Sequence, residues 1–481
     1  MSNKTEMKRS ERAFFALADI YGGGGQALIG VIYPLFFLTE IIGLSSVRAG
    51  TVVLISEIWD AISDPLMGVF CDNTRTKMGR RRPYILGGGI LLMVAFALTF
   101  LPVSFESETN KFIYCTVTYL FYNTISTVIN VSYSSMSAEI SNNSAERDKA
   151  NVLRLVVSTI GTAACTLLPS IFTGMYDKGQ IDLTTLYLII GVGFGIFFAV
   201  PVILCAIFVK ERVEPPKEMT KFNIVEFISP LKNRSFRQLL GMYLGQAVCM
   251  EVFSAGVIIF AKYVTTARNA EGEIIKGSST VFLGIFIAVQ LLAFPIINKL
   301  IKTVDVNRIY SFGLPLSIAA MVCFGLFGSQ LYVAYAMVFF VALGFAGAQL
   351  TSWIMFPHTV DAGELVTGRR QSGSYSALMT FARKSGAALV IYIFGWVLEL
   401  TGYKEQDVVQ TVSAQNGIKY VMAISCIIFM TFGFIMAKKY VLSKEKNEKV
   451  QKYLALQREN AIASLDNAEK DEYDALKKSL S

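Results

Sequence analysis

The stretch KERVEPPKEMTKFNIVEFISPLKNRSF, residues 210–236, divides a strongly apolar chain into two halves. It is polar, mixed in charge and contains a Pro-Pro pair, while six long apolar spans precede it and six follow it. A helix that crosses a membrane needs ~20 mostly apolar residues, and each span supplies about that many. Residues 210–236 are therefore predicted to be a loop outside the membrane that joins two sets of six helices.

The composition agrees with a membrane protein: 53% of the residues are hydrophobic, 17% are charged, and the mean hydropathy is +0.50. Soluble domains carry ~25% charged residues. The net charge of +8 does not indicate nucleic-acid binding, because no soluble domain with a basic face is present. The seven cysteines lie in or beside apolar runs without a CxxC pair, and His358 is the single histidine. These counts favour inert thiols and exclude a multi-histidine metal site, so no cofactor is expected.

The distribution of basic residues predicts the orientation in the membrane. Positive residues favour the cytoplasmic side. They gather before the first span, between spans two and three, and in 210–236, with the loop between spans seven and eight as an exception. The first of these groups comprises Lys4, Lys8, Arg9 and Arg12, and the second comprises Arg75, Lys77, Arg80, Arg81 and Arg82. Both termini are therefore predicted to be cytoplasmic, in an inner-membrane protein that is expected to be monomeric.

Six helices on either side of a long cytoplasmic loop is the layout of the major facilitator fold. The predicted fold class is an all-α membrane protein of this fold, with 12 transmembrane helices in two six-helix bundles. The predicted parts are an N-terminal bundle (1–209), the middle loop (210–236), a C-terminal bundle (237–441) and a charged tail (442–481). The tail is expected to be a soluble cytoplasmic helix or a flexible segment.

Three carboxylates mark the second span, SEIWDAISDPLMGVF (56–70). Glu57, Asp60 and Asp64 stand at i, i+3 and i+7, which places them within ~60° on one helical face. Three carboxylates in a low dielectric cannot all be ionised without a cation among them. The pattern predicts a site that holds protons or a small cation such as Na⁺. In the alternative interpretation, Glu57 is near a helix end or faces water, and Pro65 merely kinks the span.

Other polar groups inside apolar spans are candidates for substrate binding, because they are costly at membrane depth. Arg154, Arg383 and Lys384 could pair with carboxylates or bind hydroxyl groups, although Arg383 could instead snorkel to the surface. Asp19 and Glu251 are further acids. The fourth span is rich in neutral hydrogen-bonding groups, which suit a polyol or alternatively bond between helices; they are Asn123, Thr127, Asn130, Ser132, Tyr133, Ser134 and Ser135.

Two further features are open to more than one interpretation. Gly22 to Gly25 permit either close helix packing or an unwound turn at a cavity. The loop after the second span pairs Asp72 with a basic cluster that includes Arg80 and Arg81. Such a loop could latch one state of a rocking transporter, or it could serve only as a topology signal.

Together these residues resemble the glycoside–pentoside–hexuronide:cation symporter family, of the melibiose-permease type. The resemblance lies in WDAISDP (59–65), DNTRTKMGRRRPYILGG (72–88), AERDKANVLR (145–154), DAGELVTGRRQSG (361–373) and FARKSGAAL (381–389), and covers most of residues 10–440. It implies cation binding at Asp60, Asp64, Ser63 and Thr127. It also implies substrate binding near Arg154 and Lys384. Asp19, Asn130 and Tyr133 are further candidates for substrate binding.

The chain departs from the family pattern at three places. Where the family has an acid in the first span, this chain has the glycines Gly22 to Gly25, and Asp19 lies several residues earlier. An acid of the fourth span is replaced by Asn130, and an aromatic residue by Ser134 beside Tyr133. The amide between the two cation-site acids is Ser63. Neither galactoside recognition nor Na⁺ as the ion therefore follows from the resemblance.

The predicted function is symport of a sugar or glycoside (an oligosaccharide, pentoside or hexuronide) with H⁺ or Na⁺ by alternating access. The first alternative is a carrier of the same fold for another solute, such as a lysolipid or a drug, which would need an apolar cavity open to the side. A membrane-embedded enzyme is a weaker alternative, because no nucleophile with a base and no metal-ligand cluster accompanies the carboxylates. A sugar sensor would have only the tail 442–481 as its output element.

Overall fold

The computed structural model describes residues 7–137, 139–141, 144–212, 224–268, 274–301, 303–368, 372–405, 409–458 and 467–480. Its N-terminal half contains α1 (Arg9–Ile32), the π-helical η1 (Tyr33–Ile41), α2 (Ser46–Asn73), α3 (Arg82–Thr99), α4 (Glu108–Met136), α5 (Ser144–Asp177), α6 (Leu183–Tyr187), η2 (Leu188–Gly193) and α7 (Phe194–Phe208). Its second half contains α8 (Ile224–Ile228), η3 (Ser229–Lys232), α9 (Arg234–Tyr263), β1 (Thr266–Arg268), β2 (Ile274–Lys276), α10 (Ser279–Leu300), α11 (Val306–Phe327), α12 (Leu331–Thr367), α13 (Ser372–Leu400) and α14 (Val412–Lys438). The tail contains α15 (Lys444–Arg458) and α16 (Asn467–Leu480).

The long helices match the predicted spans. Eleven helical segments of the described chain are long and apolar enough to cross a membrane, with α1 and η1 forming one and α6, η2 and α7 forming another. The remaining long helix, α2, has 28 residues but carries Arg48 and three acids in its first 19. Its charges, and not its length, distinguish α2 from the others. The all-helical membrane fold predicted from the sequence is confirmed, and the short antiparallel pair β1 and β2 is an addition that the sequence did not indicate.

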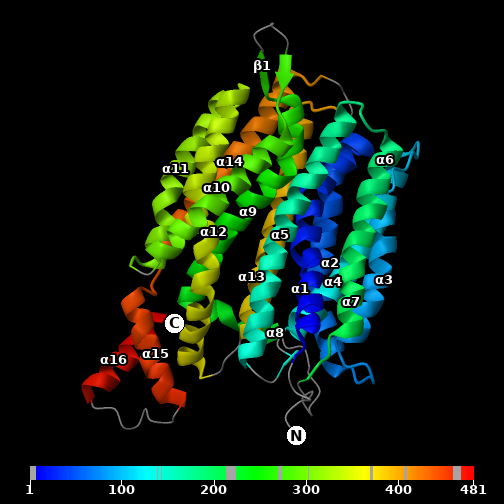
Figure 1. The fold of residues 1–481 in the computed structure, drawn as a ribbon. Coiled ribbons are helices and arrows are strands. Elements are labelled where there is room, and N and C mark those ends of the chain that lie inside the picture. Colours follow the sequence, from blue (N-terminus) through cyan, green and yellow to red (C-terminus); the bar gives the residue numbers. More distant parts are fainter. Residues whose placement is uncertain are drawn as a thin grey trace.

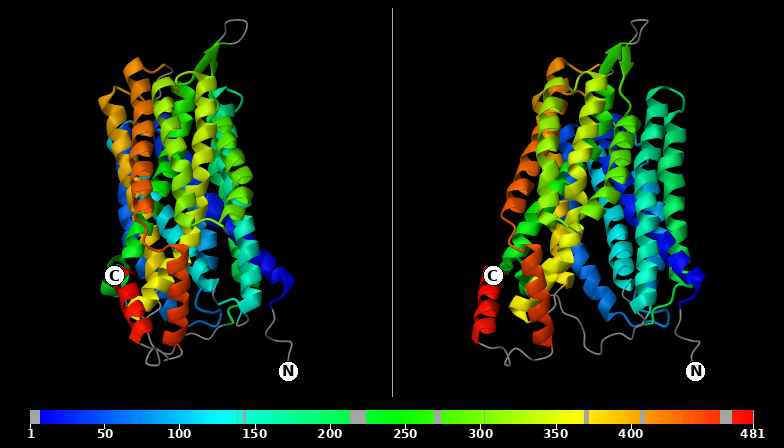
Figure 2. Two further views of the ribbon diagram at one scale, coloured as in Figure 1. Left: turned by 90° about the vertical axis from the view of Figure 1, so that its left-hand side faces the viewer. Right: turned by 60° about the vertical axis from the view of Figure 1, so that its left-hand side comes forward.

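The helices form two sets that meet along the middle of the molecule (Figures 1 and 2). In the first set α1 packs against α5 and α7, and α4 against α2 and α3; in the second, α9 packs against α14 and α12, and α11 against α12 and α14. The sets touch where α2 meets α13, α5 meets α10, and α1 meets α9. The exact boundaries of the two bundles stay a prediction, and 213–223 of the middle loop lie outside the described residues.

The two ends of the bundle differ. The hairpin of β1 and β2 stands at one end, here called the hairpin end (Figure 1). At the other end, here called the terminal end, α1 begins and the tail helices lie. There α15 and α16 pack against each other and against α12, with Asn447 Nδ2 3.1 Å from His358 Nδ1 and the Gln451 amide donating to Asp361.

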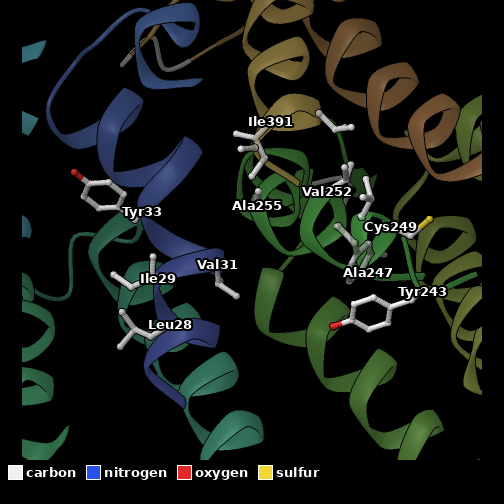
Figure 3. Close-up of a cluster of buried hydrophobic side chains, with 14 of the residues drawn as sticks. Leu28, Ile29, Val31, Tyr33, Tyr243, Ala247, Cys249, Val252, Ala255 and Ile391 are labelled. Atoms are coloured by element: carbon white, nitrogen blue, oxygen red, sulfur yellow. The ribbon is translucent and has the colours of Figure 1, made fainter. Parts of the chain in front are cut away.

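Apolar side chains fill the contact between the two sets. Val31 of α1 points toward Val252 and other residues of α9 (Figure 3), while Tyr33 lies on the far side of its helix and stacks on Tyr119 of α4. All are almost completely buried. Since lipid tails are as apolar as these side chains, close packing holds this contact together rather than removal from water.

The glycine run of α1 serves helix packing. A Cβ atom added at Gly23 would lie 2.4 Å from Thr162 Oγ1, and one added at Gly24 would lie 2.8 Å from Cys165 Sγ. Both partners belong to α5, and α1 stays helical through the run. Of the two interpretations given above for Gly22 to Gly25, the structure supports close packing.

Candidate functional site

The predicted acid pair meets a lysine from the other half of the chain. Lys384 Nζ of α13 lies 2.6 Å from Asp60 Oδ2 and 3.2 Å from Asp64 Oδ2 of α2. Asp60 is only 5% exposed. The opposite face of α2 is apolar and points outward, with Ile58 and Ile62 more than half exposed. The helical periodicity of α2 places the acids on one face and the isoleucines on the other. The acids therefore face the interface between the two halves.

Two hydroxyl groups complete the surroundings of the pair. Thr127 Oγ1 of α4 donates a 2.6 Å hydrogen bond to Asp64 Oδ1, and Ser63 Oγ lies 3.5 Å from Thr127 Oγ1. The four residues predicted to bind the cation therefore gather at one place. Their oxygen atoms are ligands of the kind that hard cations prefer. Within the described residues, no group of three or more His, Cys, Asp or Glu side chains is arranged to hold a metal ion.

A cavity of about 80 Å³ opens beside this pair, and residues of both halves line it. Apolar groups such as Ile29 and Ile391 cover part of the wall. The polar side chains in the wall are Gln26, Glu57, Asp60, Tyr119, Tyr122, Asn123, Ser126, Glu251, Arg383 and Lys384.

A second ion pair crosses the cavity wall. The Arg383 guanidinium of α13 bonds the Glu251 carboxylate of α9 and lies 3.3 Å from Gln26 Oε1 of α1. Arg383 therefore does not snorkel to the surface but pairs inside the molecule. Glu57 lies in the middle of α2 and lines the cavity, so the interpretation that it stands near a helix end is wrong.

Three predicted substrate residues form a separate cluster. Arg154 Nε of α5 lies 3.5 Å from Asp19 Oδ2 of α1, and the Arg154 guanidinium stands 5.6 Å from the centre of the Tyr133 ring. Tyr133 donates its hydroxyl to the Phe15 carbonyl. None of the three is among the residues that line the cavity described above. Asn130 lies between the two places, since its amide donates to Ser126 Oγ in the cavity wall.

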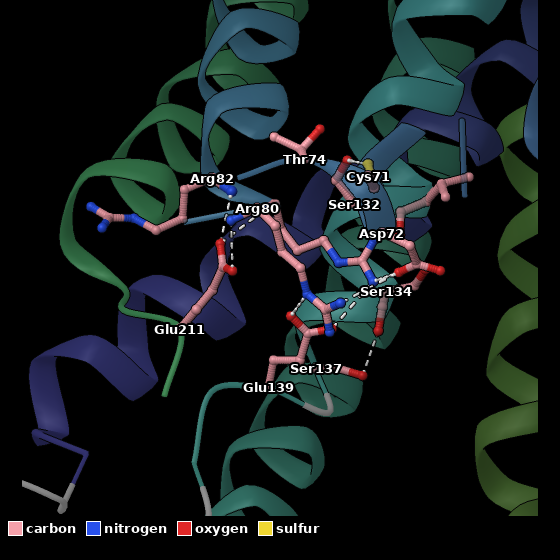
Figure 4. A network of polar contacts seen from close by, with 12 residues as sticks. Cys71, Asp72, Thr74, Arg80, Arg82, Ser132, Ser134, Ser137, Glu139 and Glu211 are labelled. Carbon is pink, nitrogen blue, oxygen red and sulfur yellow. Dashed lines mark hydrogen bonds and ion pairs between the residues drawn. The ribbon is translucent and has the colours of Figure 1, made fainter. Parts of the chain in front are cut away.

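The predicted latch residues form a charge network at the terminal end (Figure 4). Arg81 bonds Asp72 and Glu139, and Arg80 bonds Glu139 at 2.6 Å. Glu211 accepts from the backbone amides of Arg80 and Arg81. Burial alone would lower the pKa of Arg81, but Glu139 and Asp72 raise it above its usual value. Among the described residues, all these partners belong to 72–211, so the network ties the first half together and its role as a latch stays a prediction.

The hairpin end is closed by contacts between the halves. Glu40 of η1 is buried and accepts from Lys262 Nζ at 2.8 Å and from the hydroxyls of Tyr263 and Tyr403. A Cβ added at Gly395 of α13 would lie 2.3 Å from the Ser46 carbonyl oxygen of α2. The two helices therefore touch backbone to backbone at this end.

Sequence reasoning did not predict several contacts and several residues of the cavity wall. Glu251 and Arg383 were visible as charges inside apolar spans, but nothing in the sequence paired them. Tyr119 and Tyr122 stand one helical turn apart in α4 and gave no separate signal. Glu139 and Glu211 accept hydrogen bonds from the arginines of the network in Figure 4. Both lie in short polar connections, where charged residues are common and do not indicate a site.

Two helical sets around a polar, charge-paired cavity at membrane depth define a multi-pass membrane transporter of the major facilitator fold. The chain belongs to the family of MFS/sugar transport proteins, whose family model matches residues 15–444. The resemblance drawn from the sequence motifs is thereby confirmed. Membership of this symporter family makes the chain a membrane transporter and not an enzyme.

Individual relatives agree with this assignment. An inner membrane symporter of Escherichia coli, YicJ, is 27% identical over 421 residues, which cover 85% of this chain and 87% of that protein. A glucuronide carrier protein homolog of E. coli is 23% identical, covering 91% of this chain and 93% of the other. Among solved structures, a bacterial homolog of the human lysosomal transporter Spinster, in an inward-facing and unoccupied conformation, aligns with a TM-score of 0.63. The sequence identity is 13%, and the alignment covers 90% of this chain and 98% of the other. At that identity the last likeness concerns the fold alone.

Proposed function

We propose that the chain carries a sugar or glycoside together with a cation, H⁺ or Na⁺, across the cytoplasmic membrane. The observation that carries this proposal is the carboxylate pair Asp60 and Asp64, bonded by Lys384 from the other half at the edge of a polar cavity. The names of the relatives, an inner membrane symporter and a glucuronide carrier homolog, agree with it. Both termini would face the cytoplasm, as the basic residues predict.

Coupling would follow from competition at the acid pair. A cation bound by Asp60, Asp64, Ser63 and Thr127 would replace the attraction that now holds Lys384. The lysine would then be free to bond a substrate hydroxyl in the cavity. Each ligand would raise the affinity for the other by the same coupling free energy.

Alternating access would come from rocking of the two helical sets around the cavity. The contacts of Glu40 with Lys262 and Tyr403 join the two sets at the hairpin end, so in this state substrate would leave through the terminal end. The driving force is sufficient: one charge moving through 100 mV releases ~2.3 kcal/mol. At ~1.4 kcal/mol per tenfold, that supports roughly 50-fold accumulation.

The cavity wall favours a sugar over a lysolipid or an apolar drug. Glu57, Glu251, Arg383 and Lys384 all reach the wall, and desolvating such groups against an acyl chain would be costly. A second pocket is lined by apolar side chains such as Ile32, Phe36 and Leu186, but at about 10 Å³ it is smaller than the first.

Reconstitution into vesicles tests the proposal. Uptake of a panel of glycosides is measured under separate Na⁺ and H⁺ gradients, with empty vesicles as the control. At least one glycoside should accumulate above its equilibrium level under one of the two gradients. Transport of lysolipids or drugs, with no glycoside moved under either gradient, would contradict the proposal.

A further inference from the structure

The balance of charge in the cavity bears on the charge of its substrate. Four carboxylates and two cationic side chains lie in or against the wall: Glu57, Asp60, Asp64, Glu251, Arg383 and Lys384. Both cationic groups are already bonded to carboxylates, Arg383 to Glu251 and Lys384 to the acid pair. One bound coupling cation would bring the balance to three positive charges against four negative ones. The wall therefore offers an anionic ligand no excess of positive charge.

Three buried polar atoms of the wall indicate the hydrogen bonds that a ligand must make. Among the described residues, Glu57 Oε2, Asp60 Oδ1 and Asn123 Nδ2 are shielded from solvent and have no hydrogen-bond partner. Asp60 and Asn123 are 5% and 6% exposed. A buried polar atom without a partner costs free energy, so a ligand that supplies the partner is favoured.

The chemistry of these atoms selects hydroxyl groups. Two of the three are carboxyl oxygens, which only accept when the acid is ionised, and the third is an amide nitrogen, which only donates. A hydroxyl can donate to the first kind and accept from the second. A ligand carboxylate or sulfonate only accepts, so it could satisfy Asn123 but not Glu57 or Asp60, and it would stand against like charge. Tyr119 and Tyr122 add aromatic rings to the wall, against which the C–H face of a sugar ring can pack.

From these observations we infer that the site takes an uncharged sugar or glycoside and discriminates against the corresponding sugar acid, with Glu57 and Glu251 as the residues that set this specificity. The inference rests on the function proposed above. Glu57 acts directly, as an acceptor for a substrate hydroxyl. Glu251 acts through Arg383, because it holds the guanidinium away from a ligand carboxylate.

Matched pairs of glycosides test this inference in the full-length protein in vesicles. Methyl β-glucoside is compared with methyl β-glucuronide, and methyl β-galactoside with methyl β-galacturonide, since each pair differs only at C6. The neutral member should have a KM at least ~10-fold lower than its acid, because the acid leaves buried acceptors unpaired. Glu251→Gln should reduce the ratio of the acid's KM to the neutral sugar's KM, because it frees Arg383. Glu57→Gln should raise the KM of the neutral sugar. Glu399→Gln, an exposed acid on the same helix as Arg383, is the control and should change neither value.

The outcomes separate the inference from the function on which it rests. Preference of the wild-type protein for the acid member of a pair would overturn the inference while leaving sugar symport in place. Failure of every pair to move would overturn the proposed function and the inference with it. The wild-type ratio is decisive even when a variant fails to fold, because it needs no substitution.

Discussion

At the scale of single residues, Lys384 is the group on which the site depends. It bonds two carboxylates at membrane depth, and removal of one partner from a buried ion pair costs far more than the pair contributes. Replacing the lysine would leave Asp60 and Asp64 side by side without a counter-charge. The same reasoning makes the effect of an Asp60 substitution depend on whether Lys384 is present.

A double-mutant cycle tests this dependence. Lys384→Gln should destabilise the protein by ~3–5 kcal/mol, because the buried Asp60 carboxylate and the partly buried Asp64 carboxylate lose their partner. Asp60→Asn combined with Lys384→Gln should be clearly more stable than Lys384→Gln alone. Thermal unfolding in detergent measures both effects. An unfolding temperature of Lys384→Gln equal to that of the wild type would contradict the pairing.

The hydroxyl of Thr127 should contribute to cation affinity. Thr127→Val removes the 2.6 Å hydrogen bond to Asp64 and one oxygen of the proposed cation site. Bonds to charged groups contribute ~1.5–3 kcal/mol, so the cation concentration for half-maximal uptake should rise by roughly 10- to 100-fold. Thr116→Val is the matched control. The Thr116 hydroxyl lies on the same helix and donates to the Phe112 carbonyl of that helix. Equal shifts in both variants would exclude a specific role for Thr127.

That the residues of the proposed cation site lie together could be predicted from the sequence, because one helix carries most of them. The i, i+4 spacing of Asp60 and Asp64 fixes their common face, and Thr127 and Lys384 follow from the family resemblance. The cavity wall could not be predicted in the same way. The contacts of Glu251 with Arg383 and of Arg383 with Gln26 join residues 132 and 357 positions apart, and helical periodicity carries no information on which helices meet.

At the scale of elements, the close approach of α2 and α13 controls the hairpin end. Gly395→Ala should force the helices apart, since overpacking costs ~1–3 kcal/mol, and so favour a state that is open at this end. A cysteine introduced at Gln26 should then react faster with a membrane-impermeant maleimide added on the hairpin side. Gly284→Ala is the control, because a Cβ there meets nothing within 4 Å. Unchanged labelling in Gly395→Ala would show that this contact does not hold the end closed.

The tail helices should separate in acid. Lys449 and Tyr453 hydrogen-bond the Glu472 carboxylate and lower its pKa below the usual 4.5. Because the pKa of Glu472 is lower in the folded protein, the contact stabilises the packing of α15 on α16 above pH 4.5. This stabilisation is lost as the pH falls through the pKa that Glu472 has in the folded protein. Hydrogen exchange in α15 and α16 should show this loss of protection in the wild type and not in Glu472→Gln. Glu448→Gln, an exposed acid of α15, should behave like the wild type; the same acid response in Glu472→Gln would contradict the assignment.

At the scale of the whole molecule, the eleven apolar helical segments of the described chain could be predicted because their length and hydropathy suffice to identify them. The charged helix α2 meets the length requirement only. Which end is closed could not be predicted, because that depends on a few contacts between distant segments. Glu40 is an example: it lies at the end of the first span, and its partners, Lys262 at the end of α9 and Tyr403 after α13, are more than 200 residues away. The β hairpin lies in the connection that follows α9.

The central claim is that a cation held by Asp60 and Asp64 drives solute uphill. Solute accumulation in vesicles, measured side by side in the wild type, Asp60→Asn and Asp64→Asn under the same ion gradient, tests it most directly. The wild type should concentrate the solute, by up to roughly 50-fold at 100 mV for one charge. Both variants should equilibrate it without concentrating it, while still exchanging labelled for unlabelled solute. Wild-type accumulation in both variants would contradict the account.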